Sequence, residues 1–128
     1  KPLVGKRILL AEDNDLNAEI AIALLEEEGL LVERAADGVK CMEMLEKAPA
    51  HFYELILMDI QMPILGGYDT TREIRKMADA EKAAIPIIAM TANAFAEDKQ
   101  RALEAGMNDH VAKPIDMNKL IPTLQKYI

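Results

Sequence analysis

The chain has 128 residues and a formal net charge of -7; 51% of its residues are hydrophobic, and only 4% are aromatic. This length fits a single domain, residues 1–128, with a core of aliphatic side chains. The acidic balance argues against direct nucleic-acid binding, which needs clustered Lys and Arg, and suits a divalent cation.

The only cysteine, Cys41, excludes an internal disulfide and fits a reducing compartment, so we expect a cytoplasmic location. No apolar run is long enough to span a membrane, and the start, KPLVGKR, lacks the apolar core of a signal peptide. The chain also starts without methionine. We therefore expect a segment of a longer chain, or a processed chain, with residues 1–6 as a linker remnant.

Short apolar runs alternate with longer amphipathic stretches along the chain. Apolar runs bounded by turn residues predict strands, and apolar positions three or four apart predict helices. In chain order the predicted elements are strand 7–13, helix 16–29, strand 30–37, helix 38–48, strand 55–59, helix 67–79, strand 86–91, helix 96–106, strand 109–113 and helix 116–128. The first, third and fourth strands are continuously apolar, which is typical of a parallel sheet covered on both faces.

Two of the predicted helices carry more detailed expectations. The first places Leu16, Ile20 and Leu24 on one face. The last contains Pro122, which lacks an amide hydrogen, so we expect a kink or a late start there.

Polar side chains follow four of the five predicted strands; the second strand makes no obvious contribution. They are Glu12 and Asp13 after the first strand, Asp59 after the third, Thr91 after the fourth and Lys113 after the fifth. Ligands bind at the carboxyl ends of strands in open parallel sheets, so these side chains predict a site. Singly, each has an ordinary explanation, such as a turn-forming aspartate or a solvated lysine.

Three carboxylates at one sheet edge repel one another. Two unit charges ~4 Å apart repel by about 4 kcal/mol at an effective dielectric of about 20, so the cluster needs a cation or a protonated acid. Oxygen ligands favour a hard ion, Mg²⁺, which in such sites usually serves phosphate chemistry. Asp59 is then a candidate nucleophile that forms an aspartyl phosphate, with Lys113 and Thr91 as phosphoryl-binding groups.

The chain resembles the receiver domain of two-component response regulators from about Lys6 to Ile128. The motifs that carry the resemblance are, in order, LLAEDN, LILMDIQMP, GG at Gly66-Gly67, IIAMTA and EAGMNDHVAKP. The resemblance implies an α/β fold of flavodoxin-like type, with a five-stranded parallel sheet in the order 2-1-3-4-5 and helices on both faces.

The resemblance also implies individual roles at the predicted metal site. Asp59 is expected to be the phospho-acceptor and a Mg²⁺ ligand. Asp13 is expected to bind Mg²⁺ directly, and Glu12 through water. The main-chain carbonyl of Gln61 is expected to supply a further ligand.

Further roles implied by the resemblance concern the phosphoryl group. Thr91 is expected to bond it and shift inward, and Lys113 to pair with its oxygens. Ala92 is small enough to leave space for the donor. The Lys113-Pro114 bond is expected to be cis, although only about 5–6% of X-Pro bonds are.

Two positions need separate comment. The family usually has Tyr or Phe where His110 stands, so His110 is either a solvated side chain or a switch that moves with Thr91 and whose charge depends on pH. The positions that tune the phosphoryl lifetime in the family are Gln61 and Asn93 here. Their effect on the rate does not follow from the sequence.

The implied partners are a histidine kinase and a histidine-phosphotransfer domain. We favour the receiver of a hybrid sensor histidine kinase, with the domain in the cytoplasm, over a stand-alone regulator. Asn17 and Ile20 are candidates for the partner surface, although core packing is the favoured role for Ile20. A homodimer through the helix at 96–106, the strand at 109–113 and the helix at 116–128 is left open.

Other classes fit less well. A phosphatase of the haloacid dehalogenase group would carry an acid catalyst where Gln61 stands, so we expect no turnover of an outside substrate. A flavodoxin-like cofactor binder would need a phosphate-cradling loop in place of EDNDLN. A pseudo-receiver would lack one of the site residues named above.

Overall fold

Parallel strands and the helices between them make up the described part of the chain, residues 2–92 and 96–128 of a computed structural model. The strands are β1 (Arg7–Ala11), β2 (Leu31–Ala35), β3 (Leu55–Asp59), β4 (Ile87–Thr91) and β5 (Asp109–Ala112). The helices are α1 (Asp15–Glu27), α2 (Gly38–Lys47), α3 (Gly67–Arg75), α4 (Ala80–Ala83), α5 (Ala96–Ala105) and α6 (Met117–Tyr127). The five strands form one sheet in the order β2-β1-β3-β4-β5, which confirms the predicted order.

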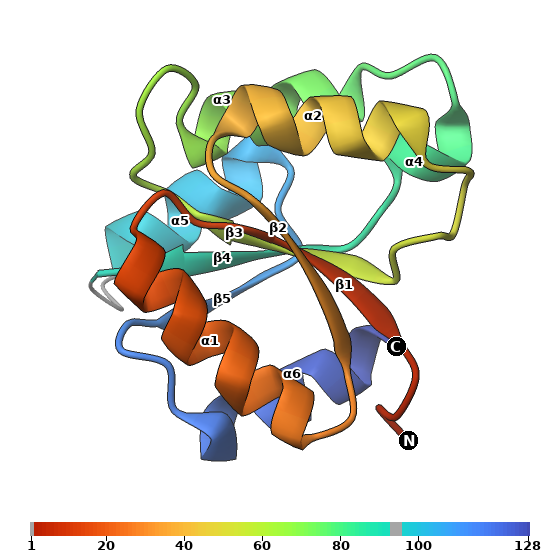
Figure 1. Cartoon of the computed structure of the whole chain (residues 1–128). Coiled ribbons are helices and arrows are strands. Elements are labelled where there is room, and N and C mark those ends of the chain that lie inside the picture. The colour runs from red at the N-terminus through yellow and green to blue at the C-terminus, as the bar shows by residue number, and fades with distance from the viewer. Residues whose placement is uncertain (1, 93–95) are drawn as a thin grey trace.

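Helices cover both faces of the sheet (Figure 1). α1 and α6 lie on one face, with Leu25 and Leu124 in the core between helices and sheet. α2, α3 and α5 lie on the other face, with Cys41, Ile74 and Ala102 in a second core. Every residue of β3 and β4 is buried, so burial from both sides explains why these strands are continuously apolar.

The strand register brings the carboxyl ends of the strands to one edge. Asp59 lies opposite Met90, the residue before Thr91. Thr91 in turn lies opposite Ala112, the residue before Lys113. Because β1 ends just before the acidic pair, all the predicted site residues that follow strands meet at the same edge of the sheet.

The predicted apolar face of α1 is not the face that packs on the sheet. Leu16 and Ile20 are 64% and 51% exposed, whereas Ala18, Ala21 and Leu25 are buried. Core packing as the role of Ile20 is therefore wrong. Small alanines let α1 approach the sheet closely, and Leu16 and Ile20 are left on the outside.

The third predicted helix ends early, at Arg75 instead of Asp79. The Arg75 guanidinium donates hydrogen bonds to the carbonyls of Ala83, Ile85 and Gly106, which ties the end of α3 to α4 and to the turn after α5. The carboxylate of Asp79 then caps α4 by accepting from two main-chain amides. With these contacts the chain leaves α3 after Arg75 and begins α4 at Ala80, so the last predicted turn of the third helix does not form.

The late start predicted for the last helix is wrong. α6 begins at Met117, where the side chain of Asp116 caps it by accepting from the amide of Asn118, and it continues through Pro122. The cap stabilises the first turn. The helix therefore forms before the proline, and the alternative, a kink at Pro122, stays a prediction.

The segment before β1 packs against the body of the domain. Leu3 is 6% exposed and belongs to the core on the α1 side of the sheet. The amide of Gly5 donates to the carbonyl of Gly29 at 2.8 Å. Residues 2–6 therefore contribute to the packing, and their status as a linker remnant stays a prediction.

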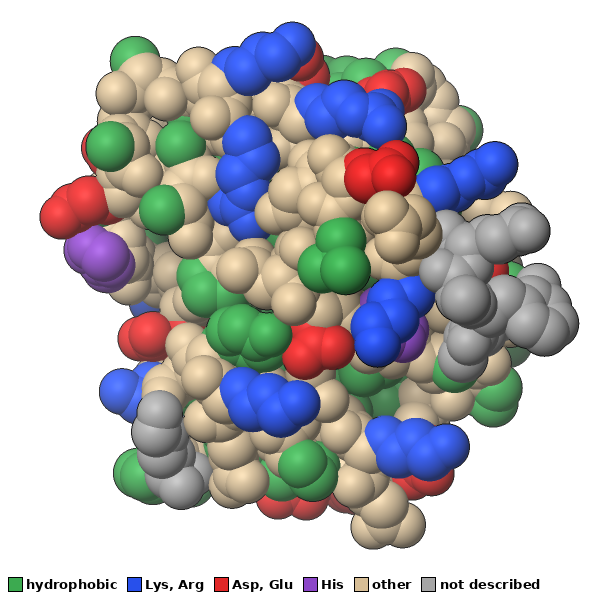
Figure 2. All heavy atoms as spheres, turned by 180° about the vertical axis from the view of Figure 1, so that it is seen from behind, with side chains coloured by type: hydrophobic (Ala, Val, Ile, Leu, Met, Phe, Trp, Pro, Cys, Tyr) green, Lys and Arg blue, Asp and Glu red, His purple; other side chains and the backbone are tan. Residues whose placement is uncertain are grey.

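Charged side chains of both signs share the face in Figure 2. Lys and Arg side chains lie there among acidic and apolar ones. A phosphate backbone is bound by a continuous basic patch, which differs from this mixed pattern. Across residues 2–92 and 96–128, no helix is long and apolar enough to cross a membrane.

Glycine allows α3 to start directly against the end of β3. A Cβ atom on Gly67 would lie 2.5 Å from the main-chain oxygen of Asp59 and 2.8 Å from the Cα of Ile60. The amide of Gly67 donates to the carbonyl of Ile60 at 2.9 Å. This close approach fixes the loop that follows Asp59.

Replacing Gly67 by alanine should therefore lower the free energy of unfolding by about 1–3 kcal/mol, because the added methyl group overlaps the backbone of β3. Urea unfolding measures the loss. Gly66→Ala is the matched control, since a Cβ at Gly66 would meet its nearest atom at 3.5 Å. Equal losses in the two variants would contradict the steric explanation.

Candidate functional site

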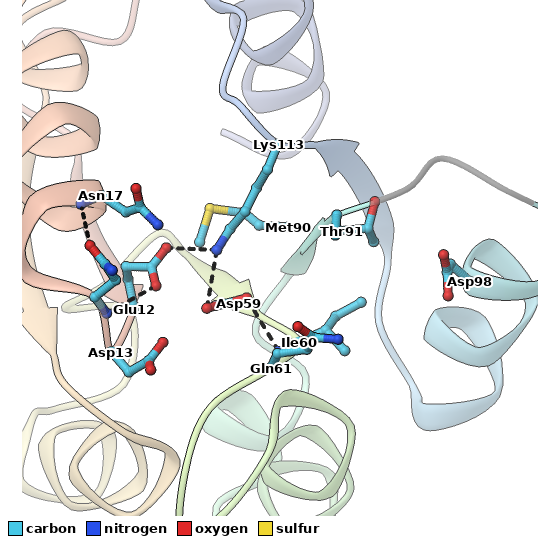
Figure 3. A pocket seen from close by; sticks show the side chains of 12 residues that line it. Glu12, Asp13, Asn17, Asp59, Ile60, Gln61, Met90, Thr91, Asp98 and Lys113 are labelled. Atoms are coloured by element: carbon cyan, nitrogen blue, oxygen red, sulfur yellow. Dashed lines mark hydrogen bonds and ion pairs between the residues drawn. The ribbon is translucent and has the colours of Figure 1, made fainter.

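The loop between β1 and α1 directs two acids differently (Figure 3). Glu12 is buried, and its amide donates to the carbonyl of Ala35 in β2. Asn14 caps α1 by accepting from the amide of Asn17, and its own amide donates to the Glu12 carboxylate at 3.2 Å. The loop thereby holds Glu12 inside the site and leaves Asp13 exposed.

Asp59 ends β3 in the same site and contacts the lysine that follows β5. Its carboxylate, 7% exposed, lies 3.1 Å from Nζ of Lys113. It also accepts a hydrogen bond from the main-chain amide of Gln61 at 3.2 Å. Nζ of Lys113 reaches Oε1 of Glu12 at 2.8 Å as well, so one ammonium group bridges the two buried acids.

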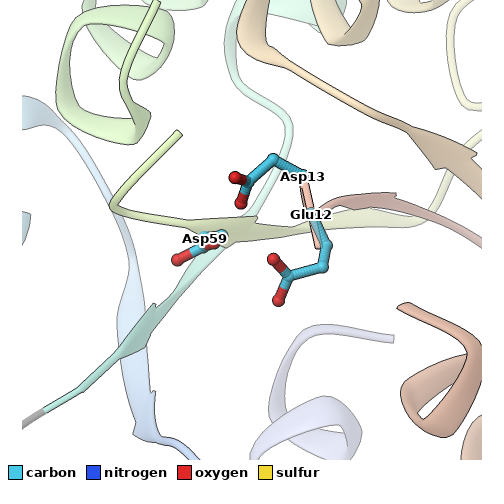
Figure 4. A group of neighbouring side chains, drawn as sticks. All are labelled: Glu12, Asp13 and Asp59. Carbon is cyan, nitrogen blue, oxygen red and sulfur yellow. The ribbon is translucent and has the colours of Figure 1, made fainter. Parts of the chain in front are cut away.

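Three carboxylates converge at this edge of the sheet (Figure 4). One oxygen from each of Glu12, Asp13 and Asp59 lies within 4.8 Å of the other two. The cluster offers oxygen ligands only, which suits a hard cation. Because Asp13 is exposed, the cluster is open to solvent on one side, and Mg²⁺ retains several waters when it binds. The residues therefore fit Mg²⁺.

Burial and mutual contact shift the protonation of the buried acids. Burial, and next the contact with Glu12, raise the pKa of Asp59 to about 7. Burial also acts to raise the pKa of Glu12, but hydrogen bonds from Lys113 and Asp59 outweigh it and leave that pKa lowered. For Lys113, the two carboxylates outweigh burial and raise the pKa. The ammonium of Lys113 and the raised pKa of Asp59, which favours its protonated form, thus both reduce the repulsion within the cluster.

A cavity of about 350 Å³ opens over the cluster. Thr91 and Ala92 line it beside the acids and Lys113. Met90 and, on α5, Asp98 also line it (Figure 3), and neither was expected from the sequence. The cavity over the Asp59 carboxylate is therefore lined mainly by polar side chains, with Ile60, Met90 and the small Ala92 among them.

The two predicted switch residues occupy different surroundings. Thr91 is buried, and its hydroxyl lies 3.5 Å from the main-chain carbonyl of Val111. The side chain of His110 is 23% exposed, with Nδ1 3.8 Å from a carboxylate oxygen of Asp109. His110 is thus partly buried on β5, and its movement with Thr91 stays a prediction.

The remaining predicted site residues have mixed outcomes. Gln61 lines the same cavity as Asp59, while the use of its carbonyl as a ligand and its effect on the phosphoryl lifetime stay predictions. Asn93 lies outside the described residues. The Lys113-Pro114 peptide bond is cis, as expected.

One contribution to the site was missed entirely, because it comes from β2. The side chain of Arg34 donates from Nε to the main-chain carbonyl of Glu12 at 2.9 Å. It also contacts Asp15, the first residue of α1. No motif marks Arg34 in the sequence, and the contact becomes visible only once β2 is placed beside β1.

Comparison with known proteins agrees with this geometry. A family model described as the response regulator receiver domain matches residues 8–125. The chain belongs to this receiver domain family. Its fold class and its place in phosphorelay signalling follow from that membership.

Receiver domains of much longer proteins are similar to this one in sequence. The chain is 38% identical over 128 residues to hybrid signal transduction histidine kinase I of Dictyostelium discoideum, covering 98% of this chain and 7% of that protein. It is 43% identical over 127 residues to histidine protein kinase 1 of Candida albicans, covering 94% of this chain and 5% of that protein. The receiver domain thus spans only a small part of the relatives it matches.

Solved receiver domains match the fold closely. The receiver domain of a sensor histidine kinase from Pseudomonas aeruginosa superposes with a TM-score of 0.85 and 41% identity, covering 97% of this chain and 98% of that one; a magnesium ion is coordinated in its active-site cleft. The receiver domain of Saccharomyces cerevisiae Ssk1, in complex with the histidine phosphotransfer protein Ypd1, gives 0.85 and 25% identity, covering 99% and 91%.

The raised pKa of Asp59 makes a prediction for the metal-free domain. The folded pKa of about 7 exceeds the value of about 3.9 expected for an unfolded aspartate, so the folded state keeps a proton that the unfolded state loses. This contribution to stability is fully present below pH ~4 and disappears as the pH rises through about 7. Relative to the wild type, Asp59→Asn should therefore gain about 1–3 kcal/mol in free energy of unfolding as the pH rises from the lower limit to the upper one.

Urea unfolding in a chelator, at several pH values from about 4.5 to 8, measures this difference. Asp69→Asn is the control, because that carboxylate lies on the exposed face of α3. A stability difference between Asp59→Asn and wild type that stays constant with pH would show that Asp59 does not titrate in this range.

Proposed function

We propose that this receiver domain accepts a phosphoryl group on Asp59 from a phosphohistidine in a Mg²⁺-dependent reaction. The observation that carries the proposal is the buried Asp59 carboxylate, in contact with Lys113 and within 4.8 Å of the oxygens of two further acids. In the transfer, the P–N bond of the donor breaks as a P–O bond to a carboxylate oxygen of Asp59 forms. The electron pair of the broken bond leaves with the imidazole.

The chain's own residues support each requirement of this reaction. Glu12, Asp13, Asp59 and the Gln61 carbonyl would hold Mg²⁺, which when bound supplies positive charge at the phosphoryl oxygens. A cation near Asp59 lowers its pKa, so the nucleophilic carboxylate form prevails at neutral pH. Lys113, already 3.1 Å from that carboxylate, is placed to pair with the incoming phosphoryl oxygens.

The cavity supports in-line access for a donor. Ala92 is exposed beside the buried Thr91, so only a methyl group stands at that part of the wall. The hydroxyl of Thr91 would donate to a phosphoryl oxygen after breaking its contact with Val111. A phosphatase that turns over outside substrates is not favoured, because Gln61 stands where a second acid would be needed.

We also propose that the segment is the receiver of a hybrid histidine kinase that works in the cytoplasm. Relatives named as hybrid kinases support this proposal, although the chain matches only 7% of such a relative. A homodimer through α5, β5 and α6 stays a prediction.

The outer face of α1 is the proposed partner surface for the histidine-bearing protein. Beside this face, a groove of about 320 Å³ runs next to Lys113 and is lined by Ile20, Ala21, Pro114 and Ile115. Ile20 is 51% exposed there, which supports its candidacy for the partner surface over a role in core packing. The groove lies beside the acceptor cavity, since Glu12, Asn17 and Lys113 line both.

Phosphorylation is directly testable. Incubation with Mg²⁺ and acetyl phosphate should add one phosphoryl group, detected by intact mass. Asp59→Ala should abolish the addition, and Lys113→Ala should slow it by about tenfold or more, because a charge that stabilises the transition state is lost. Asp69→Ala is the control and should react normally. Uptake that survives Asp59→Ala, or that needs no divalent ion, would refute the assignment.

Docking through α1 makes a separate prediction. With a phosphorylated histidine-phosphotransfer domain as donor, Ile20→Glu should lower the apparent affinity by about tenfold or more, because a charge replaces an apolar contact. The rate with acetyl phosphate should stay within about twofold of the wild type, since that donor needs no protein surface. Val4→Glu, which also changes an exposed apolar residue, is the control. Equal effects of Ile20→Glu on both donors would count against docking at α1.

A further inference from the structure

The guanidinium group of Arg34 contacts both ends of the loop that carries the candidate metal ligands. Its Nε donates to the main-chain carbonyl of Glu12 at 2.9 Å. Its Nη1 lies 2.8 Å from Oδ1 of Asp15, the first residue of α1. Its Nη2 is buried and has no hydrogen-bond partner within the described part of the chain.

We propose that Arg34 is a positioning residue for the metal site. Its planar fork fixes the loop from Glu12 to Asp15, so that the carboxylates of Glu12 and Asp13 converge on Asp59 before a cation arrives. The inference rests on the proposed magnesium site and goes beyond it. Arg34 contacts the Glu12 carbonyl and the Asp15 carboxylate, and so acts on the ligands through the backbone that bears them.

Mg²⁺ makes this positioning necessary. The ion requires near-ideal octahedral geometry and gives up its waters reluctantly, so ligands that are already placed bind it better than ligands on a mobile loop. Replacing a residue that holds a metal ligand without touching the metal commonly lowers metal affinity by about 10–100-fold. A guanidinium can hold a carbonyl and a carboxylate at once in fixed geometry, which the single ammonium of a lysine cannot do.

The contacts of Arg34 are poorly explained as a device for folding stability. The ion pair with Asp15 contributes little, since the Asp15 side chain is 91% exposed. The arginine is therefore better explained by the loop that it holds through the Glu12 carbonyl.

A purely electrostatic role predicts the opposite change in affinity. If Arg34 acted only through its charge, Arg34→Met would leave Asp15 unpaired, increase the negative charge near the site and tighten Mg²⁺ binding. Arg34→Lys would then bind Mg²⁺ like the wild type. Positioning instead predicts that both variants bind Mg²⁺ more weakly, because both lose the fork.

Titration calorimetry with Mg²⁺ on the full 128-residue chain separates the two roles. We expect the Mg²⁺ dissociation constant to rise about tenfold for Arg34→Lys and for Arg34→Met. Arg7→Lys is the matched control and should stay within about twofold, because Arg7 also joins β1 to β2 through an ion pair, with Glu33, but stands at the start of β1, at the far end of that strand from Glu12.

A second readout uses the metal-free protein. Amide hydrogen exchange at Glu12 and Asn14, whose amides donate to the Ala35 carbonyl and the Glu12 carboxylate, should be about tenfold faster in both Arg34 variants, while the midpoint of urea unfolding stays close to that of the wild type. Unchanged or tighter Mg²⁺ binding by Arg34→Met, or unchanged exchange in the loop, would overturn the proposal. A wild type that binds no Mg²⁺ would instead refute the proposed function, and the exchange data would still decide whether Arg34 holds the loop.

Discussion

Mutual repulsion among the acids at one sheet edge is the constraint around which this domain is arranged. Glu12, Asp13 and Asp59 can approach one another only because the parallel strands end in register and because Lys113 lies between the two buried carboxylates. With all four groups ionised, three negative charges and one positive charge leave an excess of two negative charges. A divalent cation would neutralise that excess, so the charge of the site matches that of the proposed Mg²⁺ ion.

The same arrangement suggests a route by which phosphorylation of Asp59 would alter the groove beside α1 and the neighbouring strand β5. Lys113 precedes a cis peptide bond and the loop that borders the groove beside α1, while Thr91 ends β4 within contact distance of β5. A phosphoryl group on Asp59 would compete with the carboxylates for Lys113 and with the Val111 carbonyl for Thr91. New contacts of Lys113 and Thr91 with the phosphoryl group would therefore alter the ends of two strands and one loop, while the packing of the core stays the same.

The sheet and the clustering of the candidate site residues at its edge followed from the sequence because their determinants are local. Continuous apolar runs predicted buried parallel strands, and polar residues at their ends predicted Asp59, Thr91 and Lys113. Determinants that depend on three-dimensional placement did not follow. α4 is too short to show any periodicity, and the contacts of Arg34 exist only between neighbouring strands. The core face of α1 was misassigned because close packing favoured alanines over the larger apolar residues that dominate a helical pattern.

That division of α1 has a consequence for how such domains diversify. Its inner positions, among them Ala18 and Ala21, are set by contact with the sheet, so a larger side chain there would push the helix outward. Its outer positions, such as Leu16 and Ile20, touch mostly solvent and can be exchanged without leaving a void in the core. If the outer face of α1 binds the partner as proposed, recognition and core packing depend on opposite sides of one helix, and a change of signalling partner need not lower the stability of the domain.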